Sequence, residues 1–281
     1  MPIEKEKITQ LEKKAYELRR MALTMIHAAK SGHPGGSFSA AEIMAVLYFN
    51  QMNLDPKNPK WEDRDRFVLS KGHVCPILYS SLILRDFLPE TEVYNLRKYG
   101  SVLQGHPDMK KCPGIDISTG SLGQGISCAV GMAVAAKMDK KDYKTYTLLG
   151  DGECNEGQVW EAVQCAVKYK LDNLVVILDN NNLQNDGTCD EVMPTGDLAK
   201  KVEAFGMEIY KVDGHSVEEL LCAFEKINDN FSSGKPKCII AKTVKGKGVS
   251  FMENVPGWHG MAPNDEEFSI AMKELGEKND N

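Results

Sequence analysis

Two apolar runs, each followed directly by polar residues, constrain most strongly how this chain can fold. The run at 146–149 precedes Gly-Asp-Gly, and the run at 174–179 precedes three asparagines. Apolar runs of this length between turn-forming residues are typical of buried strands. Because ligands of doubly wound sheets bind beyond the carboxyl ends of the strands, Asp151 and Asn181 are expected at a ligand site.

The second half of the chain alternates between strand-like and helix-like patterns. Strands are predicted near 145–149, 174–179, 207–212 and 237–244. Helices are predicted between them, near 156–169, 196–204 and 216–231. The last helix opens with Ser216 three residues before Glu219, a helix-start pattern. This alternation implies right-handed crossovers and an α/β fold with a doubly wound, mainly parallel sheet flanked by helices.

The first half is mostly helical in pattern. Apolar residues recur every three or four positions over 8–25, which predicts an amphipathic helix that a loop at 31–37 ends. The spacing of Ser39 and Glu42 matches a capping box and predicts a second helix that runs through Tyr48. The other elements expected here are one short strand and two helices, at 67–69, 76–85 and 126–138.

The length and the net charge of the chain limit the class of protein to which it can belong. The 281 residues suffice for a single α/β domain over 1–281, with a helical amino-terminal segment and a polar, flexible tail at 276–281. Two small domains are the weaker alternative. A formal charge of −6 without clusters of lysine or arginine argues against nucleic acid as a partner.

Cysteine usage and the start of the chain bear on its compartment. The eight cysteines show no C-x-x-C pair and no spacing suited to zinc, so reduced thiols and a cytoplasmic location are expected. The first residues are polar, and no stretch approaches the roughly 18 apolar residues of a membrane span. No membrane association is expected.

Asp151 and Asn181 carry side chains that a hard cation prefers. Magnesium takes oxygen ligands and commonly bridges one or two protein groups to phosphate oxygens, so a magnesium diphosphate suits these strand ends. The flanking Gly150 and Gly152 let the backbone approach a diphosphate closely. Alone, Asp151 has the alternative role of a turn aspartate that binds its own backbone. The glycine-rich stretch 120–125 matches no dinucleotide or P-loop pattern, which leaves a tightly packed helix start as its alternative.

Four histidines stand beside glycine at loop positions that could face one cleft: His33, His73, His106 and His259. A single loop histidine is usually a surface or core residue, but a rigid sheet can aim several at one cleft. His27 falls within the first predicted helix. His215 follows Asp-Gly and is expected to be a turn residue.

The stretch 150–157, GDGECNEG, resembles the thiamine diphosphate signature in the form found in transketolases. Five further motifs stand in the order of the transketolase amino-terminal half: SGHPG at 31–35, LSKGH at 69–73, GHP at 105–107, TGSLGQG at 119–125 and WHG at 258–260. Gly-Asp-Gly alone is common by chance, whereas six motifs in one order over nearly the whole chain are specific. The resemblance implies the thiamine diphosphate-binding fold.

The resemblance also implies roles at the cofactor. Asp151, the Asn181 amide and the Leu183 carbonyl would hold Mg²⁺, or another divalent cation such as Ca²⁺ or Mn²⁺. Gly152 would contact the diphosphate through its backbone, and His73 would do so through its side chain.

Further roles concern the rest of the cofactor and the substrate. By the same resemblance, Gly120 and Leu122 present backbone groups to the aminopyrimidine, and Glu156 joins a carboxylate network across a subunit interface. Three histidines line the substrate channel, where they bind sugar hydroxyls and assist proton transfer: His33, His106 and His259.

The implied reaction moves a two-carbon ketol unit from a ketose phosphate to an aldose phosphate, with thiamine diphosphate as the carrier. In transketolases a second α/β domain, normally later in the same polypeptide, supplies the glutamate that activates the pyrimidine. This sequence stops at Asn281, so the resemblance implies the amino-terminal subunit of a split transketolase. Its partner is a carboxyl-terminal subunit that carries the pyrimidine-binding domain, and the expected assembly is a two-fold heterotetramer.

Two positions depart from the family pattern, and other functions stay open. Asn185 stands where the family more often places an apolar residue against the thiazolium ring, and Met261 is an extra residue after the last motif. The alternatives within thiamine enzymes are a deoxyxylulose-phosphate synthase fragment and the alpha chain of a keto-acid dehydrogenase, although the histidines favour transketolase. A non-catalytic cofactor-binding module and a degenerate half that acts in protein interaction are the alternatives outside catalysis.

Overall fold

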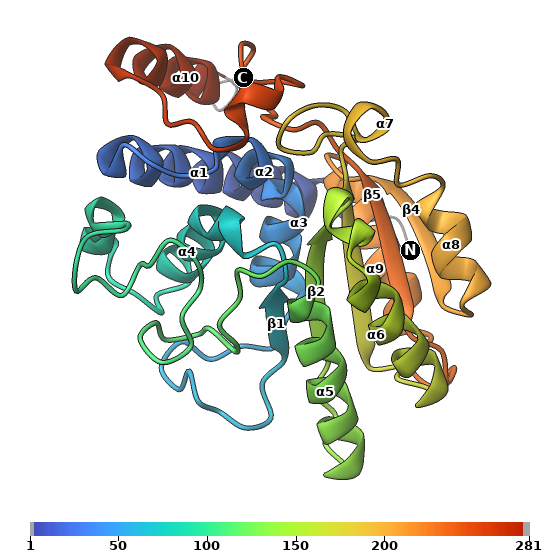
Figure 1. Cartoon of the computed structure of the whole chain (residues 1–281). Coiled ribbons are helices and arrows are strands. Elements are labelled where there is room, and N and C mark those ends of the chain that lie inside the picture. Colours follow the sequence, from blue (N-terminus) through green and yellow to red (C-terminus); the bar gives the residue numbers. More distant parts are fainter. Residues whose placement is uncertain (1–2, 278–281) are drawn as a thin grey trace.

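A five-stranded parallel sheet forms the centre of the structure, a computed structural model that describes residues 3–277 (Figure 1). The strands are β1 Arg66–Leu69, β2 Thr145–Gly150, β3 Leu174–Asn180, β4 Glu208–Asp213 and β5 Lys237–Lys242. Their order across the sheet is β1-β2-β3-β5-β4, and each neighbouring pair is parallel. The predicted α/β class is confirmed.

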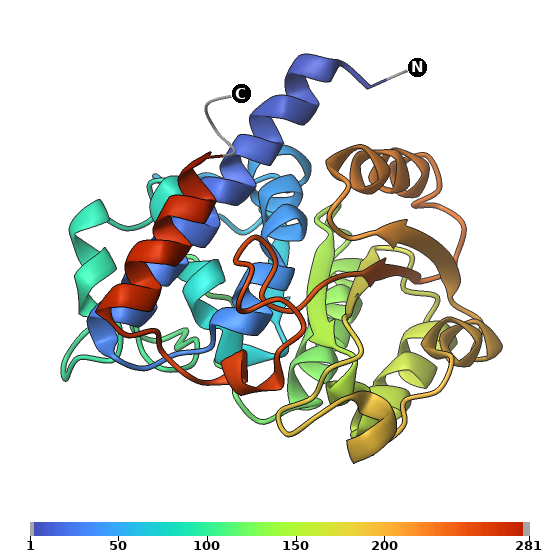
Figure 2. The same cartoon turned by 90° about the horizontal axis from the view of Figure 1, so that it is seen from above.

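Helices pack on both faces of this sheet (Figure 1). One face is covered by α1 Lys5–Ala29, α2 Pro34–Ser39, α3 Ala41–Val46, α4 Cys75–Leu84 and α9 Val217–Asn228. The other face is covered by α5 Gln124–Met138, α6 Gly157–Lys168 and α8 Leu198–Ala204. The remaining helices are α7 Cys189–Val192 and α10 Asp265–Glu277, and α10 lies along α1 (Figure 2).

Short helical turns complete the elements. A π-helix, Leu47–Gln51, continues α3, and 3₁₀ turns span Gly72–Val74, Glu90–Asn95, Gly152–Asn155 and Pro256–His259. Among the described residues, no helix is both long and apolar enough to cross a bilayer. All eight cysteines are free thiols.

Strand side chains alternate between the two apolar layers. Leu148, Ile177 and Ile239 point into the layer beneath α1, α3, α4 and α9, whereas Leu149, Leu178 and Ile240 point into the layer beneath α5, α6 and α8. Successive residues of a strand face opposite sides, so a strand with helices on both sides must be apolar throughout. This explains why the two runs are continuous rather than alternating.

The expected loop at 31–37 is wrong in its second half. Helix α2 begins at Pro34, because proline lacks the N–H that a helix start leaves unpaired and its fixed φ suits the first turn. The expected tail at 276–281 is also wrong in part, since α10 continues through Glu277, and the rest lies outside the described residues. The sequence patterns had not indicated α10.

The two expected helix starts have different outcomes. The Ser216 side chain accepts from the Glu219 N–H and caps α9, as predicted, although this helix ends at Asn228. The capping box at Ser39 and Glu42 is wrong, because α3 begins after Ala40 without a side-chain cap. Ser39 donates instead to the Gly36 carbonyl and to Asp179. Both side chains of the expected box are buried and have tertiary partners.

Glu42 anchors α3 to α1 through a buried ion pair. Arg19 donates from Nη1 and Nη2 to the two carboxylate oxygens of Glu42, each at 2.6 Å, and it also donates to the Phe38 carbonyl. Burial alone would raise the pKa of Glu42, but Arg19 and His215 outweigh it and lower the pKa to about 2. The ion pair therefore favours the folded state whenever Glu42 is ionised.

We expect Glu42→Gln to lower the free energy of unfolding at pH 7 by on the order of 3 kcal/mol. A carboxyl with a depressed pKa stabilises the fold above its unfolded pKa, and this contribution is lost as the pH falls through the folded pKa. Urea unfolding of wild type and variant should therefore differ by a constant amount above about pH 5 and converge as the pH falls toward about 2.

The matched control for this experiment is Glu17→Gln, which removes the exposed ion pair with Lys14. It should change the unfolding free energy by less than about 1 kcal/mol. A difference between wild type and Glu42→Gln that persists unchanged at low pH would contradict the assignment.

Candidate functional site

The ends of β2 and β3 lie side by side and form the floor of a pocket. Gly150 pairs with Asp179 in the register, and the Asp151 N–H donates to the Asp179 carbonyl at 3.2 Å. The pocket has a volume of about 230 Å³. Its lining is Gly36, Lys71, His73, Leu122, Gly150, Asp151, Gly152, Glu153, Asn181, Leu183, Gln184, Asn185, Lys245 and His259.

Asp151 is a buried carboxylate held by backbone groups. It is 2% exposed, and its oxygens accept from the N–H groups of Gly152 at 2.8 Å and Asn182 at 2.5 Å. Burial, followed by the neighbouring Asp179, raises the pKa of Asp151. Within residues 3–277 it has no ion-pair partner, so its remaining lone pairs are open to a cation.

Asn181 and Leu183 line the same pocket as Asp151, and each has an oxygen with a defined partner. The Asn181 side-chain oxygen accepts from the Leu183 N–H at 3.1 Å, which fixes the turn after β3. The Leu183 carbonyl accepts from the Lys245 ammonium at 3.1 Å. In the described part of the chain, no three His, Cys, Asp or Glu side chains gather as a metal site. Asp151, Asn181 and Leu183 thus contribute a carboxylate, an amide and a carbonyl to the pocket lining, and these are oxygen groups of the kind that a hard cation takes.

Three of the four predicted histidines form one cluster. The ring centroids of His33, His73 and His259 are separated by 5.1 to 5.4 Å, and the rings of His73 and His259 are stacked. His106 makes no such ring contact and instead lies against Gly120, where an added Cβ would be 3.2 Å from its ring. The structure therefore brings three histidines together directly and places the fourth beside the glycine-rich turn.

All four imidazoles are uncharged at neutral pH. Burial, followed by Arg97, lowers the pKa of His33 to about 4, and burial, followed by Lys245, lowers that of His259 to about 3. Burial also lowers the pKa of His73 and, less strongly, that of His106. A neutral imidazole has one donor and one acceptor nitrogen, so each ring can both give and accept a hydrogen bond.

Lys245 brings a cation into the same pocket. It is 3% exposed, and its ammonium donates to the carbonyls of Leu183 and Gln184 and lies 2.8 Å from Nδ1 of His259. Burial, followed by the charge of Lys71, lowers the pKa of Lys245 to about 8. Lys71 itself is paired with Asp179, so Lys245 is the pocket cation that lacks a carboxylate in contact among residues 3–277.

Glu153 joins the glycine-rich turn to the end of β2. Its carboxylate accepts from the Ser70 hydroxyl, from the Gly123 N–H at 2.9 Å and from the Gly150 N–H at 3.1 Å. Gly123 has a φ of 79°, and an added Cβ would lie 2.8 Å from the Glu156 side chain. Glycine is therefore required at this turn.

The other predicted residues take different positions. Leu122 lines the pocket, whereas Gly120 does not and lies against His106. Glu156 is exposed at the start of α6 and does not line the pocket. Asn185 lines the pocket and donates to the Asp186 carboxylate at 2.7 Å. His215 lies in the turn before α9, as expected.

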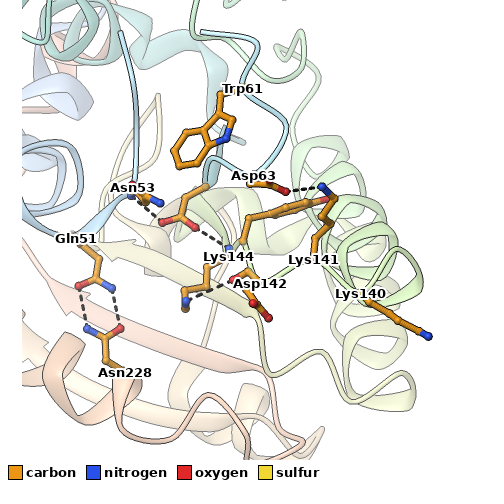
Figure 3. A pocket seen from close by; sticks show the side chains of 11 residues that line it. Gln51, Asn53, Trp61, Asp63, Lys140, Lys141, Asp142, Lys144 and Asn228 are labelled. Atoms are coloured by element: carbon orange, nitrogen blue, oxygen red, sulfur yellow. Dashed lines mark hydrogen bonds and ion pairs between the residues drawn. The ribbon is translucent and has the colours of Figure 1, made fainter. Parts of the chain in front are cut away.

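A larger cavity, of about 590 Å³, lies beside the amino ends of β1 and β2 (Figure 3). Two pairs of its polar side chains contact each other: Lys141 with Asp63 at 2.6 Å, and Gln51 with Asn228 at 2.9 Å. Asp65 accepts from two backbone N–H groups that precede these strands. No histidine lines it, so we place the functional site in the smaller pocket at the carboxyl edge.

Comparison with known families agrees with this placement. Residues 11–281 match the family described as transketolase, thiamine diphosphate binding domain. The chain belongs to the transketolase family. The predicted resemblance is thereby confirmed.

The relatives of this chain differ in length: some match it over nearly their whole length, and others are longer. One of the subunits of apulose-4-phosphate transketolase from Phocaeicola vulgatus is 42% identical, and the match covers 96% of this chain and 95% of that protein. The 6-deoxy-6-sulfo-D-fructose transketolase subunit of a Clostridium strain is 43% identical, with 96% and 98% covered. The crystal structure of Campylobacter jejuni transketolase superposes with a TM-score of 0.89 at 36% identity, covering 95% of this chain but 43% of that chain. The chain thus corresponds to the amino-terminal subunit of split transketolases.

Sequence reasoning missed three charged residues of this pocket: Lys71, Glu153 and Lys245. Lys245 follows β5, and a signal was present, because the ends of parallel strands share one edge of the sheet. Glu153 lies inside the GDGE motif, but its partners on a distant turn were not visible in the sequence.

Proposed function

We propose that this chain acts with a partner subunit to move a two-carbon ketol unit from a ketose phosphate to an aldose phosphate. The observation that carries the proposal is a single pocket in which the buried Asp151 carboxylate, without an ion-pair partner among residues 3–277, accompanies uncharged imidazoles. The carboxylate suits a cation and its diphosphate, and the imidazoles suit hydroxyl binding and proton transfer. When bound, thiamine diphosphate supplies the electron sink that side chains lack.

The residues at the strand ends fit a cation with its diphosphate. Asp151, the Asn181 amide and the Leu183 carbonyl hold Mg²⁺, or Ca²⁺ or Mn²⁺ in its place. The Gly152 backbone and the His73 side chain contact the diphosphate. The fit is supported by the open lone pairs of Asp151 and by Gly152, where a Cβ would come within 2.9 Å of Gln184.

The remaining residues contact the aminopyrimidine ring of the cofactor or face the partner subunit. Gly120 and Leu122 offer backbone groups to the aminopyrimidine, and Lys245 adds a positive charge on the diphosphate side. Glu156, which is exposed, joins a carboxylate network at the subunit interface. The glycine-rich turn and α6 lie near this interface.

The substrate is a polar sugar phosphate that neutral histidines can bind. His33 and His259 lie in one ring cluster, and His106 borders the turn beside it. Each neutral ring can accept a hydroxyl proton on one nitrogen and donate from the other. This proposal places the chain in the carbohydrate metabolism of the cytoplasm, as in the pentose phosphate pathway.

We expect Asp151→Ala to weaken the binding of thiamine diphosphate with magnesium by at least about several-fold, because the only carboxylate ligand is lost. Calorimetric titration of the reconstituted enzyme measures the dissociation constant. The control is Asp139→Ala, an exposed aspartate after α5, which should bind as wild type does. Unchanged affinity in Asp151→Ala would remove the metal assignment.

Replacing His33, His106 or His259 by Ala should depress turnover, on the order of 100-fold for a proton-transfer role, and leave cofactor binding largely intact. His73→Ala should weaken cofactor binding instead. Steady-state kinetics and calorimetry on the same samples separate these effects, with His27→Ala as the control, since His27 stacks on Phe268 outside the pocket. Four variants with the same behaviour in both assays would contradict this division of roles.

The chain alone should be inactive and should gain activity on mixing with its carboxyl-terminal partner, because ylid formation needs a glutamate that the family places in the other domain. The assay is ketol transfer from xylulose 5-phosphate to ribose 5-phosphate, first with the chain alone and then with the product of the adjacent gene. Light scattering should give the mass of two chains with two partners. Robust activity of the lone chain would exclude the two-subunit proposal.

A further inference from the structure

The segment that leaves β5 carries a side chain of the pocket at its third residue. The Thr243 N–H donates to the Asn180 carbonyl at 3.1 Å, and its hydroxyl donates to Asp179. Two residues later, Lys245 reaches the Leu183 carbonyl and His259. Val244 lies between them and outside the sheet, so its N–H donates to a side chain and not to a neighbouring strand. The direction of Lys245 thus depends on how this N–H is held.

That acceptor is His215, which lies in the turn between β4 and α9. The Val244 N–H donates to His215 Nε2 at 2.8 Å. The other ring nitrogen, Nδ1, lies 2.9 Å from Glu42 Oε2, and the side chains of His215 and Glu42 are 12% and 9% exposed. Glu42 is in turn held by Arg19 of α1, which is 1% exposed. An Arg–Glu–His chain therefore connects α1 and α3 to the backbone next to Lys245.

The partners on its two sides fix the protonation of the His215 ring. A backbone N–H only donates, so Nε2 must carry a lone pair. A carboxylate that is ionised only accepts, so Nδ1 must carry the proton. The ring is therefore the neutral Nδ1–H tautomer, oriented by Glu42 in the way that a carboxylate orients the far nitrogen of a metal-bound histidine.

We propose that His215 is a positioning residue for the cofactor site. It holds the Val244 N–H and thereby directs the Lys245 ammonium toward the place where the diphosphate binds. This inference rests on the proposed function, in which the diphosphate binds beside Lys245. His215 does not line the pocket, so it touches no ligand itself. If its acceptor is lost, the Val244 N–H has no partner in the fold and the segment must shift to reach water.

Two amide substitutions separate the two ring nitrogens. In His215→Gln the side-chain oxygen can reach the place of Nε2 and accept from Val244. In His215→Asn the amide reaches only the place of Nδ1, so it can donate to Glu42 but cannot reach Val244. Both variants lose the imidazole from a largely buried position, so a merely structural role would destabilise both.

The experiment is calorimetric titration of the complex with its partner subunit, using thiamine diphosphate in magnesium chloride, alongside thermal unfolding. We expect His215→Asn to weaken binding by roughly 5- to 30-fold, the effect of one lost hydrogen bond at a buried donor. His215→Gln should stay within about threefold of wild type. The control His27→Asn, at a histidine that packs on α10, should bind as wild type does.

A double-mutant cycle with Lys245→Met tests whether His215 acts through Lys245. If it does, adding His215→Asn to Lys245→Met should cause little further loss of affinity. Three results would overturn this inference but not the proposed function. They are full additivity in the cycle, wild-type affinity in His215→Asn, and equal losses of affinity in the Asn and Gln variants. A wild-type complex that binds no thiamine diphosphate would overturn the proposed function and this inference with it.

Discussion

The functional edge of the sheet depends on one buried carboxylate, Asp179, at the end of the central strand β3. It is fully buried and accepts from Lys71 after β1, from Ser39 of α2 and from Thr243 after β5. Burial would raise its pKa, but the pairing with Lys71 and the hydrogen bonds from Ser39 and Thr243 together outweigh this and lower the pKa. A buried ion pair tolerates the loss of neither partner, because the remaining charge is left uncompensated. Four segments therefore meet at one charge, and each of them also carries a residue that lines the pocket: Gly36, Lys71, Asn181 and Lys245.

The pocket contains both positive and negative side chains, which suits a bound diphosphate together with its cation. Asp179 neutralises Lys71, and the lining of the pocket also holds the charged groups of Lys245 and Asp151. Neither of these two has an ion-pair partner in the described chain; Lys245 is solvated by carbonyls and Asp151 by backbone N–H groups. Such preformed dipoles compensate a buried charge without cancelling it. In the proposed complex the anionic diphosphate faces Lys245 and the cation faces Asp151.

Local patterns predicted the sheet and the polar tips of its strands, but not the partners that cross the fold. Asp151 and Asn181 could be placed because strand ends are marked by a change from apolar to polar residues next to glycine or asparagine. The Ser39 and Glu42 pattern led to a wrong prediction, because in a capping box both side chains bind the backbone at the start of their own helix. In the fold both side chains are buried and bind Asp179 and Arg19 instead. Lys245 could have been found from its position just after β5, whereas His215 became visible only once the order of β4 and β5 was known, since that order decides which turns are neighbours.

The strand order also bears on how the chain folds as it is synthesised. β1 has a single neighbour, β2, which begins at Thr145, so its edge stays open while a long stretch is made. β4 likewise has no neighbour until β5 arrives to fill the place between it and β3. Parallel pairing across such separations closes long loops and is intrinsically slow. The pocket needs Lys245 and His259, so it forms only after the segment that follows β5 has been synthesised, and until then exposed strand edges leave the nascent chain open to misassociation.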